Sequence, residues 1–439
     1  MKLLSLFLCT PCLLLSAQAD PPKSRKPAAS TSALSALRLE DLTRLALAQN
    51  PAIQAARAKW EAWQQRIPQA AAWDDPRVGA NTRLGRFVNV APNSFTDQMW
   101  TVEQMVPVSG KNLSRARIAA AEAVGALEEL RRAQLEVAAK VRAAYYQLAR
   151  DCALLDLNHE DETSLQQSLE VIRAKLAVGG QSQTDALTAE AELMRIAEAR
   201  RDLERQLVEE QTQINVLTHR DALAAVARPA AETLSLRSEP PPENRLRTTM
   251  LASRPEVRMA EAGVTAARAR LQLAQRDWFP DPTLNLQAQR YNEGSQVISE
   301  VSAGVSFNIP WANGRKYRAE EKEAALNVEA AQRELDGTRA EALGALHSQL
   351  QKIDTLHHHA ELFAARLVPN ARQIVETNRA NYEAGRAGFL DLVLSQRSLR
   401  ETQAMQLAHL ADYRIAVAEL DSLVGADPGP AKPHTSSNK

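Results

Sequence analysis

The stretch TLNLQAQRYNEGSQVISEVSAGVSFNIP, from Thr283 to Pro310, decides the fold of this chain. Apolar and polar residues alternate strictly from residue 284 to 290, and after a turn around residues 292–294 the alternation resumes up to Ile309. The apolar set comprises Leu284, Leu286, Ala288, Val301, Ala303, Val305, Phe307 and Ile309. A period of two predicts strands whose two faces meet different solvents. The opposite set is polar and uncharged, which suits it to face water in a lumen.

The number of strands separates a soluble sheet from a membrane barrel. A sandwich strand also alternates, so the pattern alone fits both. Helical patterns dominate the rest of the chain, and the other candidate strand pair is residues 77–84 and 98–107. About four strands cannot close a barrel, which needs roughly eight, and an open sheet edge cannot lie in lipid. If these strands cross a membrane, several chains must therefore share one barrel.

The N-terminus has the layout of a secretory signal peptide. Lys2 precedes an apolar run over residues 3–15, and the Ala-Gln-Ala motif at residues 17–19 is a small-x-small cleavage site. The run is too short for a membrane anchor. We therefore expect residues 1–19 to be removed and Asp20 to begin the mature chain.

Composition excludes several classes of function. Lysine plus arginine and aspartate plus glutamate both number 53, so no nucleic-acid or acidic-polymer partner is predicted. Beyond the signal, no apolar run reaches the length of a membrane helix. Cys152 is the only mature cysteine, which excludes an intramolecular disulfide. Its place in a series of apolar residues at coiled-coil spacing predicts that it packs in a helix seam.

Long helices make up most of the chain. Residues 113–176 contain no proline and one glycine, Gly125, and at 1.5 Å per residue they predict a rod of roughly 95 Å. Coiled-coil spacing is kept by Leu165, Leu169, Ile172 and Leu176. Gly179 and Gly180 then break the rod, and residues 184–217 are predicted to return antiparallel to it.

The order of elements repeats along the chain. The motif pairs are Asn50-Pro51 with Arg254-Pro255, WDDP at 73–76 with WFPDP at 278–282, Val106-Pro107 and Gly110-Lys111 with Ile309-Pro310 and Gly314-Arg315, and Gly179 and Asp185 with Gly385 and Asp391. The separations all lie near about two hundred residues, which indicates a tandem duplication. Each half is expected to supply a strand hairpin and a long helical hairpin.

These boundaries define the expected domains. The predicted order is a signal peptide (1–19), a flexible arm (20–36), a first repeat (37–226, with strands in 77–108 and helices in 111–218), a Pro-rich linker (227–244), a second repeat (245–425, with strands in 283–310 and helices in 315–424) and a disordered tail (426–439). The predicted fold class is therefore mainly α, with a small β part for a shared barrel.

The chain resembles the TolC family of outer-membrane efflux proteins, and within it the heavy-metal (cation) efflux branch. The matching motifs are Asn50-Pro51, the run from Val106 to Lys111, Val178-Gly179 with Thr184-Asp185, Tyr382-Glu383-Ala384-Gly385, Phe389-Leu390-Asp391-Leu392 and Gln396-Arg397. The resemblance covers roughly residues 37–425. It implies a homotrimer whose barrel of twelve strands lies in outer-membrane lipid above a periplasmic helical tunnel.

The resemblance also implies partners and functional positions. The tunnel tips would dock a periplasmic adaptor (membrane fusion) protein, which joins an inner-membrane pump of the RND type. The implied tip residues are Val178, Gly179, Gly180, Thr184, Asp185, Ala384, Gly385 and Arg386. Acidic residues one turn apart constrict the tunnel in the family; here Asp391 matches the first position, and Leu394 replaces the second. Asp391 also fits a local role at a helix start, near the positive end of the helix.

No catalytic motif and no cofactor-binding motif is present, so neither an enzyme nor a cofactor is expected. Three consecutive histidines, residues 357–359, point about 100° apart on a helix and cannot close on one ion. His357, with Glu361 at i+4, and His358 remain weak metal candidates, and His357 also continues an apolar seam. The acidic pairs at residues 128–129 and 209–210 are predicted to be solvated.

Three functions fit this pattern. The first is a passive outer-membrane exit duct of a tripartite efflux pump, with heavy-metal cations favoured over drugs as substrate. The second is the duct of a type I protein secretion system, which the same architecture permits. The third is a soluble periplasmic coiled-coil scaffold, which membrane fractionation would distinguish from the other two.

Overall fold

The computed structural model describes residues 37–83, 97–177, 182–230, 233–236, 241–293 and 296–425. The chain divides into two units, residues 1–35 and 36–439, and all the structure described below belongs to the second. The predicted signal peptide, N-terminal arm and C-terminal tail lie outside the described residues, and so do the tip residues Val178, Gly179 and Gly180.

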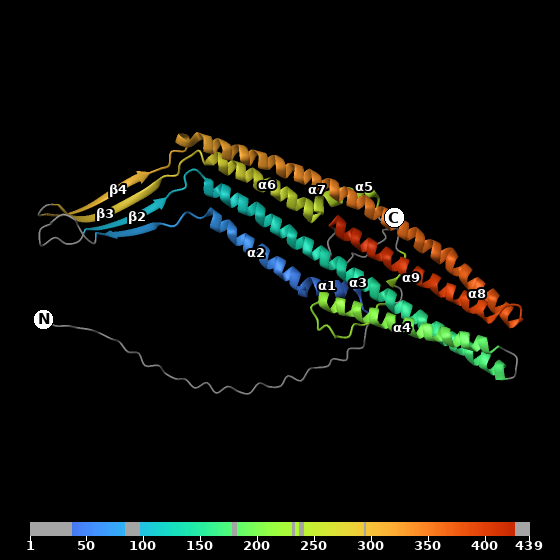
Figure 1. The fold of residues 1–439 in the computed structure, drawn as a ribbon. Coiled ribbons are helices and arrows are strands. Elements are labelled where there is room, and N and C mark those ends of the chain that lie inside the picture. The colour runs from blue at the N-terminus through green and yellow to red at the C-terminus, as the bar shows by residue number, and fades with distance from the viewer. Residues whose placement is uncertain are drawn as a thin grey trace, which may run out of the picture. The chain divides into compact units, whose positions relative to one another are not determined.

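Four strands form one antiparallel sheet in the order β1-β2-β3-β4 (Figure 1). They are β1 (Arg77–Thr82), β2 (Gln98–Met105), β3 (Thr283–Glu293) and β4 (Gln296–Ser306). Because β2 pairs with β3 over its whole length, two strand pairs far apart in the sequence join into one sheet. Within the described residues β1 and β4 pair on one side only, which leaves two open edges.

The strand ends differ slightly from those predicted. β2 stops at Met105 rather than at Pro107, since proline has no N–H to donate to a strand ladder. β3 continues into the predicted turn as far as Glu293, which pairs with Gln296.

The first half of the chain contributes four helices. They are α1 (Leu39–Gln49), α2 (Pro51–Ala71), α3 (Lys111–Ala177) and α4 (Gln183–Leu217). The Asn50 side chain explains the Asn-Pro motif: its oxygen accepts from Ala52 N at 2.9 Å and caps α2, while its amide donates to the Leu217 carbonyl at 2.9 Å. One residue thus starts α2 and ties it to the end of α4.

The second half uses more, shorter pieces. They are α5 (Glu243–Ser253), α6 (Pro255–Arg276), the 3₁₀ turn η2 (Pro310–Asn313), α7 (Gly314–Leu362), the π-helical turn η3 (Phe363–Leu367), α8 (Val368–Glu383) and α9 (Phe389–Val424). This π turn lies inside the helical hairpin that was predicted for residues 315–424. The structure places the π turn directly ahead of Pro369, which lacks the N–H that a regular α-helix requires.

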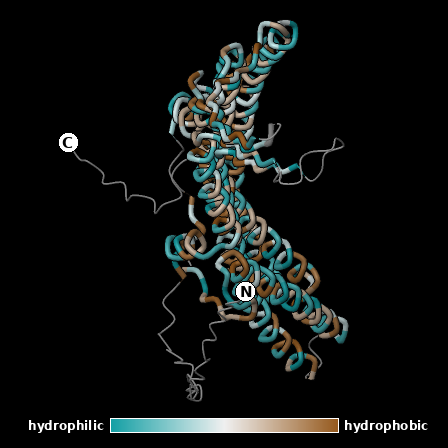
Figure 2. Tube along the Cα trace, turned by 90° about the vertical axis from the view of Figure 1, so that its left-hand side faces the viewer, coloured by the Kyte–Doolittle hydropathy of each residue, from teal (hydrophilic) through white to brown (hydrophobic). Residues whose placement is uncertain are grey.

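The core consists of seams between helices rather than one compact centre. Three clusters of buried residues lie along the helices, and the predicted seam residues Leu165, Leu169 and Ile172 belong to the one nearest the tips. Cys152 is buried in another, which confirms its predicted packing role. Hydrophobic and hydrophilic residues mix along the helices (Figure 2). In the part of the chain that is described, no helix has both the length and the apolar character needed to cross a membrane.

Candidate functional site: sheet faces, hairpin tips and inter-hairpin charges

The register places most apolar residues of the four strands on one face of the sheet. Val78 pairs with Val102, Val102 with Leu286, and Leu284 with Val305. This face is the exposed one, since Val78 is 72% exposed and Val305 is 62% exposed. A soluble sheet would bury its apolar face. An apolar face turned outward is the arrangement of a barrel that meets lipid.

The opposite face carries mainly polar and small residues, several of which are half-buried. It includes Thr101, Asn285 and Gln287. Two glycines, Gly79 and Gly304, lie opposite Thr101 and Asn285, whose side chains fill the space that a Cβ would take. The sequence pattern therefore predicted correctly which of the quoted residues of β3 and β4 share a face of the sheet.

Large aromatic side chains surround the point where the strands meet the helices. Trp73, Phe279, Phe307 and Trp311 are each more than half exposed. They come from both halves of the chain and flank the strand ends. Aromatic rings at this level are typical of the interface between lipid hydrocarbon and water.

The junction between sheet and helices is held by charged groups. The Asp281 carboxylate accepts from Ser109 N and Ser109 Oγ, both at 2.8 Å, and lies 3.5 Å from Lys111 Nζ. Arg276 donates to the Ser109 carbonyl at 2.7 Å. Gly110 adopts a φ of 73°, and a Cβ there would collide with the Arg276 guanidinium. The Ser-Gly-Lys motif therefore has a structural reason at this turn.

The tip between α8 and α9 reverses through a left-handed glycine. Gly385 has a φ of 70°, and Arg386 N donates to the Asn381 carbonyl at 2.8 Å. The predicted tip residues Ala384, Gly385 and Arg386 are exposed. The left-handed conformation of Gly385 lets the chain reverse at this position.

The start of α4 packs close to this turn. Ser182 caps α4 by accepting from Thr184 N at 3.1 Å, and Asp185 lies in the first helical turn. Burial and the nearby Asp185 carboxylate raise the pKa of the Tyr382 hydroxyl, at the end of α8. Two of the predicted tip positions from the first half, Thr184 and Asp185, thus lie beside the second tip.

Asp391 caps its own helix. Its Oδ2 accepts from Gly388 N at 3.2 Å, the contact that the N3 acid makes in a capping box, although Gly388 has no side chain to return it. Asp391 and Leu394 are both exposed and one turn apart. The geometry supports the local role directly, and a constriction formed by Asp391 and Leu394 stays a prediction.

The three histidines of the run have different neighbours. His357 packs edge-on against the buried Tyr413, with ring centroids 5.5 Å apart, as the apolar seam predicted. His358 and Glu361 are exposed. Among the described residues, no group of three or more histidine, cysteine, aspartate and glutamate side chains is placed to hold a metal ion.

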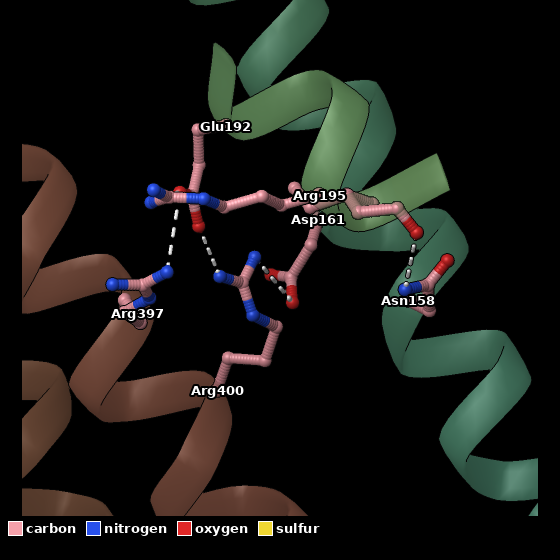
Figure 3. Close-up of polar contacts among 7 residues, drawn as sticks. Asn158, Asp161, Glu192, Arg195, Arg397 and Arg400 are labelled. Atoms are coloured by element: carbon pink, nitrogen blue, oxygen red, sulfur yellow. Dashed lines mark hydrogen bonds and ion pairs between the residues drawn. The ribbon is translucent and has the colours of Figure 1, made fainter. Parts of the chain in front are cut away.

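A charge network joins the two helical hairpins (Figure 3). Glu192 of α4 is almost fully buried and faces three arginines: Arg400 Nη2 at 2.6 Å, Arg195 Nη1 at 3.3 Å and Arg397 Nη2 at 3.7 Å. Arg397 and Arg400 come from α9, so this carboxylate holds the two hairpins together. On its other side, Arg400 Nη1 lies 3.8 Å from Asp161 of α3.

Burial governs the electrostatics of this network. Burial raises the pKa of the Asp161 carboxyl, and the Arg400 guanidinium partly opposes that rise. Arg397 belongs to a motif recognised in the sequence, but its partner Glu192 was not predicted. The available signal was spacing: Glu192 lies three residues after buried Ala189 and four before buried Ile196, on the seam side of α4.

Glu128 corrects one prediction. The pair at residues 128–129 was expected to be solvated, but Glu128 is 0% exposed. Its Oε1 lies 2.8 Å from Arg131 Nη1 and 3.0 Å from Arg258 of α6. Another inter-half ion pair thus joins α3 to α6, because α6 supplies a cation that the local sequence does not reveal.

The family model described as outer membrane efflux protein matches residues 42–220 and 246–426. The cobalt-zinc-cadmium resistance protein CzcC of Cupriavidus metallidurans is 24% identical over 422 residues, covering 93% of this chain and 95% of CzcC. The outer-membrane channel OprN has a TM-score of 0.75 at 18% identity, covering 89% of this chain and 91% of its own. CusC has a TM-score of 0.76 at 16% identity, with 89% and 93% covered.

The two-faced sheet, the helical hairpins and these matches define an outer-membrane channel with a periplasmic helical part. The chain belongs to the outer membrane efflux protein family, which confirms the resemblance drawn from its motifs. It is an efflux channel of the outer membrane. Channels of this family work with adaptor proteins and inner-membrane pumps.

Proposed function

We propose that three copies of this chain close one barrel of twelve strands and act as a passive exit duct. The observation that carries this is the sheet with two open edges and an outward apolar face. Unpaired edges expose backbone N–H and C=O groups, which lipid cannot satisfy. Pairing β1 of one copy with β4 of the next removes every edge once the ring closes.

The tips are the proposed docking point for an adaptor that connects to an RND-type pump. The proposed contacts are Val178, Gly179, Gly180, Thr184, Asp185, Ala384, Gly385 and Arg386. Support comes from the exposure of the described turn and from its position at the far end of the second hairpin from the strands. A left-handed glycine presents backbone without a side chain and allows a close contact.

Heavy-metal cations are the proposed substrate. Support comes from the full-length similarity to CzcC, whose name gives it a role in resistance to cobalt, zinc and cadmium. Export of drugs or of proteins through the same architecture is the alternative. The test is complementation of a strain lacking its own outer-membrane duct, with the cognate adaptor and pump co-expressed. Restored tolerance of cobalt, zinc or cadmium supports the proposal; restored tolerance of drugs alone contradicts it.

The docking proposal is tested with Gly385→Trp. A Cβ at Gly385 meets no atom within 4 Å, so the indole should project outward and leave the trimer intact. We expect loss of efflux and of adaptor crosslinking with near-normal trimer yield, and the same for Gly179→Trp. Gly385→Ala is the matched control, because it carries the backbone strain without the bulk. Full efflux in both tryptophan variants would remove the docking assignment.

A further inference from the structure

Two histidines face each other across the second hairpin, away from the residues that the metal-site prediction named. His359, near the end of α7, and His409 of α9 have ring centroids 5.1 Å apart, with planes tilted by 57°. They lie 50 residues apart in the chain numbering, and only the antiparallel packing of α7 on α9 brings them together. His359, the third histidine of the run, therefore packs against His409, whereas His357 packs against Tyr413.

The local environment leaves one imidazole nitrogen unsatisfied. His409 Nδ1 is enclosed and has no hydrogen-bond partner. The Phe363 ring lies 5.0 Å from that of His409, centroid to centroid, and shields it on one side. An enclosed ring nitrogen without a partner is uncommon in folded proteins and points to an unfilled ligand position.

The spacing of the rings fits joint coordination of one ion. Metal–nitrogen bonds to histidine are about 2.0–2.1 Å, so two imidazoles bound tetrahedrally to one ion have centroids about 5 Å apart. The observed separation matches this value. Phe363 also begins the π turn, a feature found frequently at functional sites.

Access and charge favour a cation. His359 lines an open groove of about 570 Å³ between α7 and α9, so water can complete the coordination. Asp412 and Lys352 line the same groove, and the Lys352 ammonium is neutralised by Glu419 at 2.8 Å. The Asp412 carboxylate thus adds negative charge to the groove that His359 lines.

We propose that His359 and His409 bind one divalent late transition-metal ion, such as Zn²⁺ or Co²⁺, with water as the remaining ligands. Imidazole suits these ions, whereas Mg²⁺ and Ca²⁺ require oxygen ligands. Two protein ligands make a weak, labile site, which suits a duct because a tightly held ion would block transit. The site stands independently of the proposed substrate.

The test is a competition titration of Zn²⁺ against a chromophoric chelator, using the full-length protein purified without a polyhistidine tag. We expect one ion per chain, and at least a tenfold weaker affinity in His359→Gln and in His409→Gln. The double variant should bind no more weakly than either single variant. His358→Gln is the matched control and should stay within twofold of wild type. Wild-type affinity in both single variants would overturn the proposal.

A spectroscopic measurement covers the case in which His409→Gln fails to assemble. Cu²⁺ bound to the wild-type protein should show hyperfine coupling to two imidazole nitrogens in its electron paramagnetic resonance spectrum. Coupling to one nitrogen in His359→Gln supports the pair. A wild-type spectrum with one nitrogen or none contradicts it. Because both experiments use purified protein, their failure leaves the efflux proposal untouched, and failed complementation leaves this site untouched.

Discussion

The two helical hairpins perform the same task with different construction. In the first, α3 runs 67 residues without interruption to the tip. In the second, the equivalent path is divided by the π turn at Phe363–Leu367 before it reaches Gly385. A proline at position 369 explains the difference, because its ring and missing N–H forbid a regular turn at that point. Duplicated sequences thus retained length and direction while their backbones diverged.

The turns after the strands differ in the same way. Gly110 is left-handed with a φ of 73°, whereas its counterpart Gly314 is right-handed with a φ of −58°. The 3₁₀ turn η2 precedes Gly314 and changes the approach of the chain. A repeated glycine therefore marks an equivalent position, but it does not guarantee an equivalent conformation.

The largest expected effect tests whether the strands of both halves share one lipid-facing surface. Val305→Arg on β4 and Val78→Arg on β1 should each impair insertion, at about 2–4 kcal/mol if they lie near mid-bilayer. Ser306→Arg on the opposite face should assemble normally and change single-channel conductance. Trimer recovery from outer-membrane fractions measures all three. If only one of the two valine positions is sensitive, the halves do not contribute equally to the surface.

The next prediction concerns the charges that join the hairpins. Glu192→Gln should destabilise the protein by about 1–3 kcal/mol, because it leaves Arg397 and Arg400 without the carboxylate that they share. Glu190 lies two residues before Glu192 on α4. Glu190→Gln should cost less than about 1 kcal/mol, since the ion pair of Glu190 with Arg173 is solvated. Chemical unfolding of detergent-solubilised protein gives both values. Equal losses would mean that burial of Glu192 contributes nothing.

The tip glycines provide a smaller contrast within the second hairpin. Gly385→Ala should cost about 1–2 kcal/mol, because φ is positive there while nothing obstructs the added methyl group. Gly388→Ala, where φ is −79°, should cost less, about 0.5–1 kcal/mol, because alanine is a poorer N-cap than glycine but meets no backbone strain there. Thermal unfolding of the two variants side by side separates backbone strain from tip packing. A larger loss in Gly388→Ala would contradict the assignment of strain to Gly385.

The smallest effect depends on pH and belongs to the first hairpin. Burial, with a further contribution from Asp151, raises the pKa of the Glu210 carboxyl above 4.5. The ionised form is therefore disfavoured in the fold, so this destabilisation is present at neutral pH and disappears as pH falls towards 4.5. Glu210→Gln should melt at a slightly higher temperature than wild type at pH 7.5 and at the same temperature near pH 4. A constant difference would show that ionisation is not the cause.

Local sequence rules were sufficient to predict the strands, the seams and the turn at Gly385. Alternation with a period of two, heptad spacing and the absence of helix breakers are properties of neighbouring residues, so no distant contact is needed to recognise them. Local rules did not predict which charged side chains are buried. Glu128 looked solvated, and Glu192 drew no notice, because their partners Arg258 and Arg400 lie far away in the sequence.

What the sequence determined alone was the periodic and repeated part of this protein: two strand hairpins, two helical hairpins and their order. Only the tertiary structure decided which polar groups meet. Packing α9 against α4 places Arg400 on Glu192, and packing it against α7 places His409 on His359. The physical reason is that period and propensity act over a few residues, whereas burial of a charge or an imidazole depends on the side chain that a second helix presents.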